Sequence, residues 1–133
     1  MARSETDDQV WQRWLKEHNK KRPPPPRPIH AIADITFLRT EEGGRTGPVI
    51  DGYRGQFHYE GNDSHLGAEY IFASNDPVQP GESTEAIIWL LAPEAHAGHL
   101  YPGREFEIRE GRQVVARGRI TWVIFESGKD CSL

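Results

Sequence analysis

The chain has few of the features that would cross-link it or carry it into a membrane. Its 133 residues include one cysteine, Cys131, so neither an internal disulfide nor a zinc site built from several cysteines can form. The longest apolar run, residues 86–92, is far shorter than the roughly 18 residues of a membrane span, and the N-terminus lacks the apolar stretch of a secretory signal. We therefore expect a soluble, cytoplasmic protein without membrane contact.

Motifs for nucleotide binding and catalysis are also missing. Neither GxxxxGK[ST] nor GxGxxG occurs, so neither phosphate-binding loop is supported. Glu94, His96 and His99 have a spacing that suits a metal site, but their surroundings are typical of a loop, and we expect solvated histidines. Residues 63–65, Asp-Ser-His, follow one another in a turn, which is not how a catalytic triad converges. We expect a non-catalytic protein that binds no nucleotide, metal or other cofactor.

Charge is distributed unevenly along the chain. Residues 1–33 carry seven basic and four acidic residues, a net charge of +3, whereas residues 34–126 carry eight basic and fifteen acidic residues, a net charge of −7. Proteins that bind nucleic acid without sequence preference usually present a basic surface. The acidic character of residues 34–126 argues against that class.

Residues 1–28 are predicted to form a helix and a proline-rich linker. Thr6 and Gln9 have the spacing of a capping box, which predicts a helix from about Asp7 to Lys20. The prolines at 23–26 end that helix, because proline lacks an N–H group and restricts the residue before it. The segment is expected to act as a stiff spacer.

The predicted helix carries one narrow apolar stripe, which includes Trp11, Trp14 and Leu15. An isolated helix of this length is marginal in water, so the two tryptophans need a surface to cover them. Either they dock on the folded part of this protein, or they anchor the helix in a groove of a protein partner, as aromatic hot spots do. The three residues are therefore candidate partner anchors.

From residue 29 the apolar pattern changes to a period of two, which predicts strands. Residues 29–37 alternate between apolar and polar side chains, similar alternation recurs further along, and the run 87–91 predicts a strand covered on both sides. Glycine- and proline-containing turns separate these segments. We expect a small antiparallel barrel or sandwich over residues 29–126 that folds without the first 22 residues, and a flexible tail at 127–133.

Five short strings carry more information than this periodicity. They are Asp34–Leu38, Glu41–Arg45, Gly52–Phe57, Val78–Gly81 and Phe106–Gly111. In this order and spacing they resemble the C-terminal third domain of bacterial translation elongation factor Tu. The resemblance covers about residues 29–124 and implies a six-stranded antiparallel Greek-key barrel, here without the GTPase domain and second barrel of an elongation factor.

The resemblance also implies binding surfaces. In the family this barrel binds no nucleotide, packs against the GTPase domain, contacts the T-stem of aminoacyl-tRNA and helps to bind the nucleotide-exchange factor. The positions on or beside the matching tRNA side, with a threonine where the family usually has histidine, are Arg45, Thr46, Arg54, Gln56, Glu110 and Gly111.

Three departures from the family's pattern weaken its usual contacts. Glu107 replaces a small alanine that faces the GTPase domain, and we expect an unpaired carboxylate there to impair docking. Gly55 replaces a proline and is expected to loosen its loop, and Trp122 replaces a basic residue. The favoured hypothesis is an adaptor or decoy that binds a translation-associated or elongation-factor-binding protein. The alternative is an RNA-binding module that contacts a tRNA T-stem-like helix.

Overall fold

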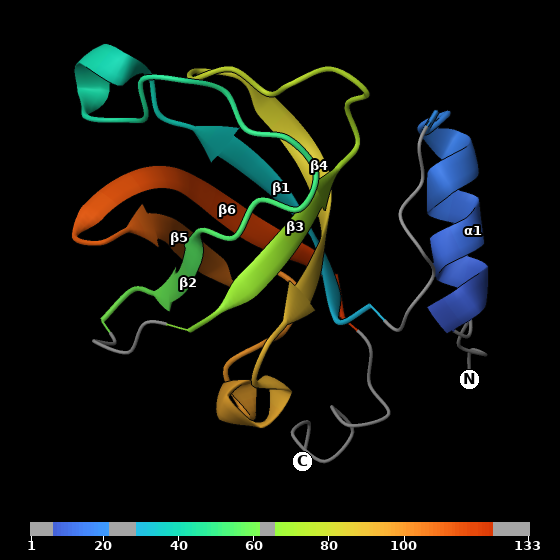
Figure 1. Ribbon diagram of the computed structural model, residues 1–133. Coiled ribbons are helices and arrows are strands. Elements are labelled where there is room, and N and C mark those ends of the chain that lie inside the picture. Colours follow the sequence, from blue (N-terminus) through green and yellow to red (C-terminus); the bar gives the residue numbers. More distant parts are fainter. Residues whose placement is uncertain (1–6, 22–28, 62–65, 124–133) are drawn as a thin grey trace.

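Six antiparallel strands curl around one apolar core, and a single helix lies against the outside of the sheet (Figure 1). The structure is a computed structural model that describes residues 7–21, 29–61 and 66–123. The elements are α1 (Asp7–Glu17), β1 (Ala31–Phe37), the 3-10 turn η1 (Thr40–Glu42), β2 (Gln56–Tyr59), β3 (Ala68–Phe72), β4 (Ser83–Leu90), the 3-10 turn η2 (Pro93–His96), β5 (Glu105–Glu110) and β6 (Gln113–Val123).

Four expectations fall outside the described residues. They concern the capping role of Thr6, the proline-rich linker at 23–28, the turn at 63–65 and the tail at 127–133. The division of the chain at residue 28 stays a prediction.

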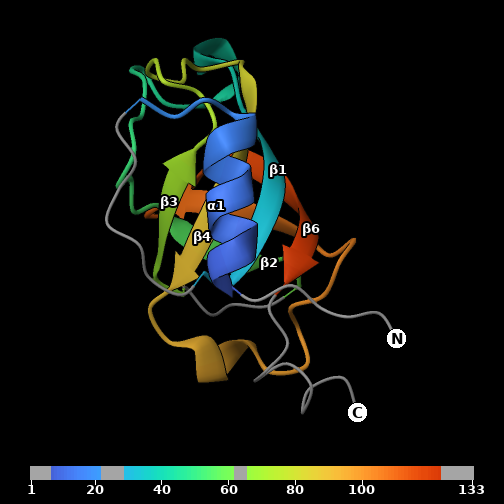
Figure 2. The same ribbon diagram turned by 90° about the vertical axis from the view of Figure 1, so that its right-hand side faces the viewer.

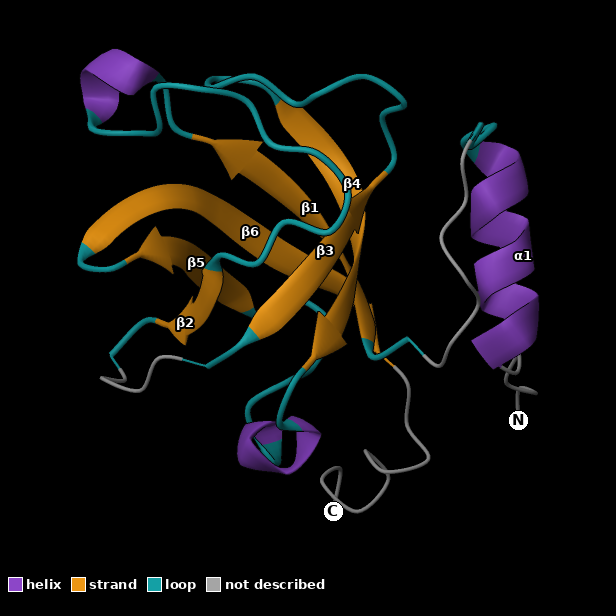
Figure 3. Cartoon of the chain, in the orientation of Figure 1, coloured by secondary structure: helices purple, strands orange, loops and turns teal. Residues whose placement is uncertain are grey.

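The strands follow one another across the sheet in the order β2-β5-β6-β1-β4-β3, with every pair antiparallel (Figure 3). Isolated bridges join the two edges of the sheet to each other: Phe57 of β2 pairs with Leu66, just before β3, and Tyr53, just before β2, pairs with Tyr70 of β3. The Phe57 N–H donates to the Leu66 carbonyl at 2.7 Å, and the Tyr70 N–H donates to the Tyr53 carbonyl at 2.9 Å. These bonds occupy backbone groups that an open sheet edge leaves unpaired.

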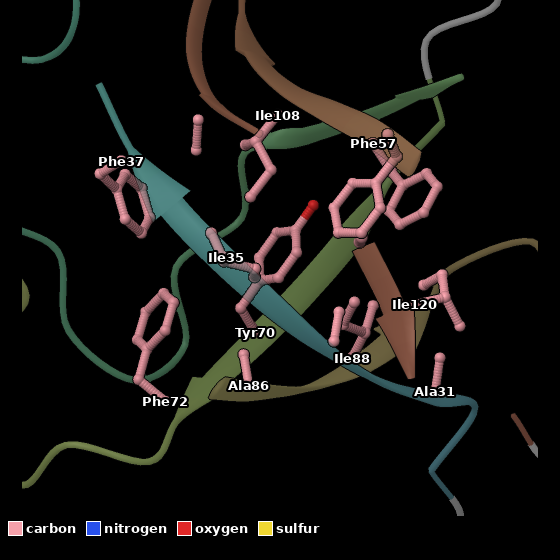
Figure 4. Close-up of a cluster of buried hydrophobic side chains, with 14 of the residues drawn as sticks. Ala31, Ile35, Phe37, Phe57, Tyr70, Phe72, Ala86, Ile88, Ile108 and Ile120 are labelled. Carbon is pink, nitrogen blue, oxygen red and sulfur yellow. The ribbon is translucent and has the colours of Figure 1, made fainter. Parts of the chain in front are cut away.

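The first apolar core lies inside the curl and follows from the alternation in the sequence. Ala31, Ala33, Ile35 and Phe37 on β1 point inward, whereas Asp34 and Thr36 point outward. The same alternation places side chains from the other strands against them, as Figure 4 shows for Phe57, Tyr70, Ile88 and others. The predicted antiparallel barrel is thus confirmed.

A second apolar core lies outside the sheet, beneath α1. The helix runs across β4, with β3 and β1 on either side (Figure 2). The members of this outer core are Val10, Trp11 and Trp14 of the helix and Ile29, Ile32, Ile71, Ile87 and Trp89, with Leu15, Ala73 and Trp122 packed at its margin. Strand β4 is therefore covered on both faces, as the apolar run predicts, except that Leu91 lies beyond its end and is 60% exposed.

Polar contacts fix the C-terminal end of α1 to the sheet. The Trp14 Nε1–H donates to Glu85 Oε1 at 2.8 Å. The Lys20 ammonium, with its side chain only 2% exposed, donates to Asp51 Oδ2, to the Phe72 carbonyl and to the Ser74 carbonyl at 2.8, 2.8 and 3.1 Å. The helix ends at Glu17, earlier than the sequence predicts, because Asn19 adopts a left-handed conformation with φ of 51°.

The docking of α1 bears on two expectations. Trp11 and Trp14 are 2% and 3% exposed, so the barrel of this protein covers them and they do not project toward a partner. Leu15 is half-buried at the margin of the same core. Because α1 supplies three of the buried members of the outer core, residues 29–126 do not contain all of the apolar packing, and their folding without the first 22 residues stays a prediction.

Candidate functional site

Arg45, Tyr53 and Glu110 meet at one rim of the barrel, where η1, the segment before β2 and the end of β5 come together. The Arg45 guanidinium forms an ion pair with Glu110 through Nη1 and Oε2. The Tyr53 hydroxyl donates to the same carboxylate oxygen at 2.5 Å, and the Arg45 Cζ lies 5.4 Å from the centroid of the Tyr53 ring. The structure thus brings together two of the residues predicted for the site, and adds a tyrosine that was not predicted.

The loop that carries Arg45 depends on a close backbone approach. A Cβ atom at Gly44 would lie 2.3 Å from the Leu38 carbonyl oxygen, so only glycine fits there. The other donors of Arg45 are used locally, with Nε bonded to the Gly47 carbonyl at 3.1 Å and Nη2 to the Pro48 carbonyl at 3.3 Å. The guanidinium therefore closes its own loop onto β5.

Burial raises the pKa of Tyr53 well above its usual range, and the hydrogen bond to Glu110 raises it further. The phenol therefore remains protonated at neutral pH and acts as a hydrogen-bond donor. Arg45, Tyr53 and Glu110 form a satisfied, partly buried network with a clear structural role.

The other predicted residues surround this network without joining it. Thr46 is exposed, and Gly111 forms the β5–β6 turn with φ of 63°. The side chain of Arg54 is 67% exposed, with Nη2 3.3 Å from Glu69 Oε1. Gln56 pairs with Arg109 in the β2–β5 register, and its buried Oε1 has no hydrogen-bond partner within the described part of the chain.

Two family departures have a local explanation. Glu107 is not unpaired, because the Nε and Nη2 groups of Arg109 donate to its Oε1 at 3.0 and 2.7 Å, so the expected unpaired charge is wrong. Gly55 is tightly packed: a Cβ atom there would lie 2.4 Å from Ile108 Cγ2 and 2.5 Å from the Tyr53 hydroxyl. Its small size lets Tyr53 reach the rim network.

His96 is buried, contrary to the expectation of a solvated loop histidine. It is 2% exposed, and its Nδ1 lies 2.6 Å from the Tyr59 hydroxyl. Its Nε2 has no hydrogen-bond partner among the described residues, and burial lowers the pKa of His96 to about 4. His99 is exposed, and the described residues contain no group of three or more side chains placed to hold a metal ion.

The comparison with known protein families agrees with the barrel fold. The model of the elongation factor Tu C-terminal domain family matches residues 28–124, which is most of the chain. The domain of this family is a β-barrel that performs no catalysis in translation. No helix in the described residues has the length and apolar character needed to cross a membrane.

Proposed function

The chain belongs to the elongation factor Tu C-terminal domain family, and from this premise we propose that it is a non-catalytic module that binds a protein partner in translation. The partner is a translation-associated protein or one that recognises this domain in the elongation factor. Bound to such a protein, the module acts as an adaptor or as a decoy that occupies the partner's binding surface.

The state of Arg45 is the observation that carries this proposal. Its charge is balanced by Glu110, and its remaining donors are bonded to loop carbonyls. A guanidinium committed in this way has little left to offer an RNA phosphate, which needs a free cation. The retention of arginine and glutamate at these positions is accounted for by the rim network.

The outer face of β5 and β6 supports a protein partner for a second reason. Its charges alternate in sign: Glu107 lies near Arg109 and Arg117, and Arg119 lies across from Asp34 and Glu105 in the strand register. A surface with charges of both signs can complement another protein surface, whereas an RNA backbone would meet its carboxylates.

RNA binding is the second candidate, and the exposure of three rim residues favours it. Thr46, Arg54 and Gly111 are accessible on the side that matches the tRNA-contacting side of the family. In this case Arg54 would supply the main phosphate contact.

Capture from cell lysate with the full-length chain, performed with and without ribonuclease, separates the two candidates. We expect a translation-associated protein to be retained at the same level in both samples. The capture is repeated with Arg54→Ala and with Arg13→Ala as a matched control, because Arg13 is an exposed arginine on the helix. Loss of the captured protein after ribonuclease, or selectively with Arg54→Ala together with bound tRNA, would overturn the protein-binding proposal.

A further inference from the structure

The loop between β4 and β5, residues 91–104, exposes unusual apolar surface. Among the described residues, three large hydrophobic side chains are exposed to solvent, and two of them, Leu91 at 60% and Tyr101 at 47%, lie in this loop. An exposed aromatic residue beside an arginine is the composition of a protein-binding hot spot.

Arg104 at the end of this loop is held between two aromatic rings. Its Cζ lies 4.5 Å from the centroid of Tyr59 and 5.6 Å from that of Tyr101. Its Nη1 makes only long contacts of 3.5 Å, to the His99 carbonyl and the Tyr101 hydroxyl. No carboxylate of residues 7–21, 29–61 or 66–123 forms an ion pair with Arg104, in contrast to Arg45 and Arg109.

The backbone around Arg104 is fixed before any partner arrives. The Ile120 N–H donates to the Arg104 carbonyl at 2.8 Å, and the Gly103 N–H donates to the Ile120 carbonyl at 2.7 Å. The Arg104 N–H closes a turn onto the Tyr101 carbonyl at 3.0 Å, with Gly103 in the left-handed region at φ of 92°. A guanidinium presented on a fixed turn loses little freedom on binding.

We propose that Tyr101 and Arg104 form a docking surface for a protein segment that carries a carboxylate beside an apolar side chain. The guanidinium fork binds the carboxylate, and the exposed face of Tyr101 packs against the neighbouring apolar group. A lone guanidinium at this site, in a chain with a net charge of −4, matches a single carboxylate better than a polyanion. The inference rests on the proposed protein-binding role and names the surface and the chemistry of the partner.

The test is an NMR titration of the full-length chain with the acetylated, amidated tripeptide Leu-Glu-Leu. Its control is the tripeptide Leu-Gln-Leu, which keeps the shape and removes the charge. We expect the Nε–H signal of Arg104 and the amide of Tyr101 to shift in a saturable way with Leu-Glu-Leu, with a Kd on the order of millimolar. Leu-Gln-Leu should leave the Arg104 signal in place.

Two variants and one control locate the effect. Arg104→Ala and Tyr101→Ala should each weaken binding of Leu-Glu-Leu, the first by roughly tenfold or more because a charge-assisted hydrogen bond is lost. Arg112→Ala removes an exposed arginine beyond the opposite end of β5 and should bind as the parent chain does. Amide spectra verify that each variant keeps the fold. If Arg104→Ala disturbs the packing against Tyr59, the result for Tyr101→Ala decides the test.

Equal binding of both tripeptides, or equal binding by the parent chain and both variants, would overturn the proposal. So would an RNA duplex that shifts the Arg104 signal and displaces Leu-Glu-Leu, since that would identify a polyanion site. The outcomes are separable from those of the lysate experiment. If the titration fails but the captured protein resists ribonuclease, only the docking surface at Tyr101 and Arg104 is rejected. If the titration succeeds but ribonuclease abolishes capture, only the proposed role in translation is rejected.

Discussion

The inner and outer cores of this protein differ in which aromatic residues build them. The inner core, inside the curled sheet, contains phenylalanines and tyrosines, among them Phe57, Tyr59 and Tyr70. All four tryptophans of the chain belong to the outer core beneath α1 or pack at its margin. The inner core comes from strands alone, whereas the outer core requires a helix of 11 residues that is too short to be stable by itself.

This difference shows that the helix and the barrel depend on each other in unequal ways. Without the barrel, α1 has no surface to cover its tryptophans and would not persist. Without α1, the strands still carry the side chains of the inner core but expose the outward faces of Ile32, Ile71, Ile87 and Trp89 to water. The distribution also supplies a measurement, because tryptophan fluorescence reports on the outer core and tyrosine signals report mainly on the inner one.

The largest expected effect comes from removing residues 1–21. The shortened chain exposes the apolar face under α1, and each buried aromatic or aliphatic side chain that is uncovered costs about 1.5–3 kcal/mol. We expect the free energy of unfolding to fall by more than 5 kcal/mol, so that the chain aggregates or unfolds at room temperature. Urea unfolding followed by circular dichroism measures this, together with size-exclusion chromatography.

A shortened chain that is monomeric and as stable as the parent would show that the barrel does not need the outer core. In that case the original expectation that residues 29–126 fold alone would be correct. Red-shifted emission from Trp89 and Trp122 in such a chain would confirm that the two side chains had become exposed to solvent.

Trp11→Ala compares the two cores at a single position. Trp11 is 2% exposed, and its ring lies 5.6 Å from that of Trp89, so truncation leaves a large cavity. We expect a loss of about 3–5 kcal/mol, similar to that of Phe57→Ala in the inner core. In urea unfolding of the parent chain, the transitions followed by tryptophan fluorescence and by circular dichroism should coincide. In Trp11→Ala the fluorescence transition should occur at a lower urea concentration than the circular dichroism transition.

Coincident transitions in Trp11→Ala would mean that the two cores unfold as one cooperative unit. Gln12→Ala is the matched control, because Gln12 follows Trp11 in the same helix turn and is exposed. It should change the free energy of unfolding by less than about 0.5 kcal/mol.

Acid should weaken the inner core through His96. The folded chain lowers the pKa of His96 from 6.5 to about 4, so the unfolded chain takes up a proton first as the pH falls. Stability from this group is complete above pH 6.5 and is lost between pH 6.5 and 4, by up to about 3 kcal/mol. Urea unfolding at intervals from pH 7.5 to 4 measures the loss.

His96→Asn removes the titrating group while keeping a polar atom near the Tyr59 hydroxyl. The variant should be less sensitive to pH in this interval than the parent chain, whereas His99→Asn, at an exposed histidine, should behave as the parent does. Identical pH profiles for the parent chain and His96→Asn would show that other groups cause the acid sensitivity.

The inner core was predictable from the sequence because alternation along a strand determines which side chains face inward. Strand β1 shows this most clearly, since Ala31, Ala33, Ile35 and Phe37 all belong to the inner core. Periodicity could not predict what α1 packs against, because the same stripe of tryptophans can dock on the barrel of this protein or on a partner protein. The choice depends on Ile71, Ile87 and Trp89, which lie more than 50 positions away from the helix.

The candidate site was predictable only in part, for a similar reason. Arg45 and Glu110 were identified through the family resemblance, but nothing in their spacing indicated that they pair across 65 positions. Tyr53 lies within one of the strings that match the family, but nothing in the sequence indicated that its hydroxyl completes the network. The burial of His96 depends on Tyr59, 37 positions earlier, so local sequence around the histidines indicated only a loop.

The smallest expected effect concerns the polar margin of the outer core at Lys20. Lys20→Met keeps the length of the side chain but removes the ammonium that bonds Asp51 and two backbone carbonyls. Asp51 is partly exposed and regains water, so we expect a loss of about 2 kcal/mol, less than that for a cavity in either core. Lys21→Met is the matched control, since Lys21 is exposed and bonds Asn75 through its backbone N–H alone.

Urea unfolding followed by tryptophan fluorescence should show the loss for Lys20→Met and no change for Lys21→Met. An equal effect of the two substitutions would mean that α1 is held by its tryptophans alone, and that the polar contacts at its C-terminal end add nothing to the outer core.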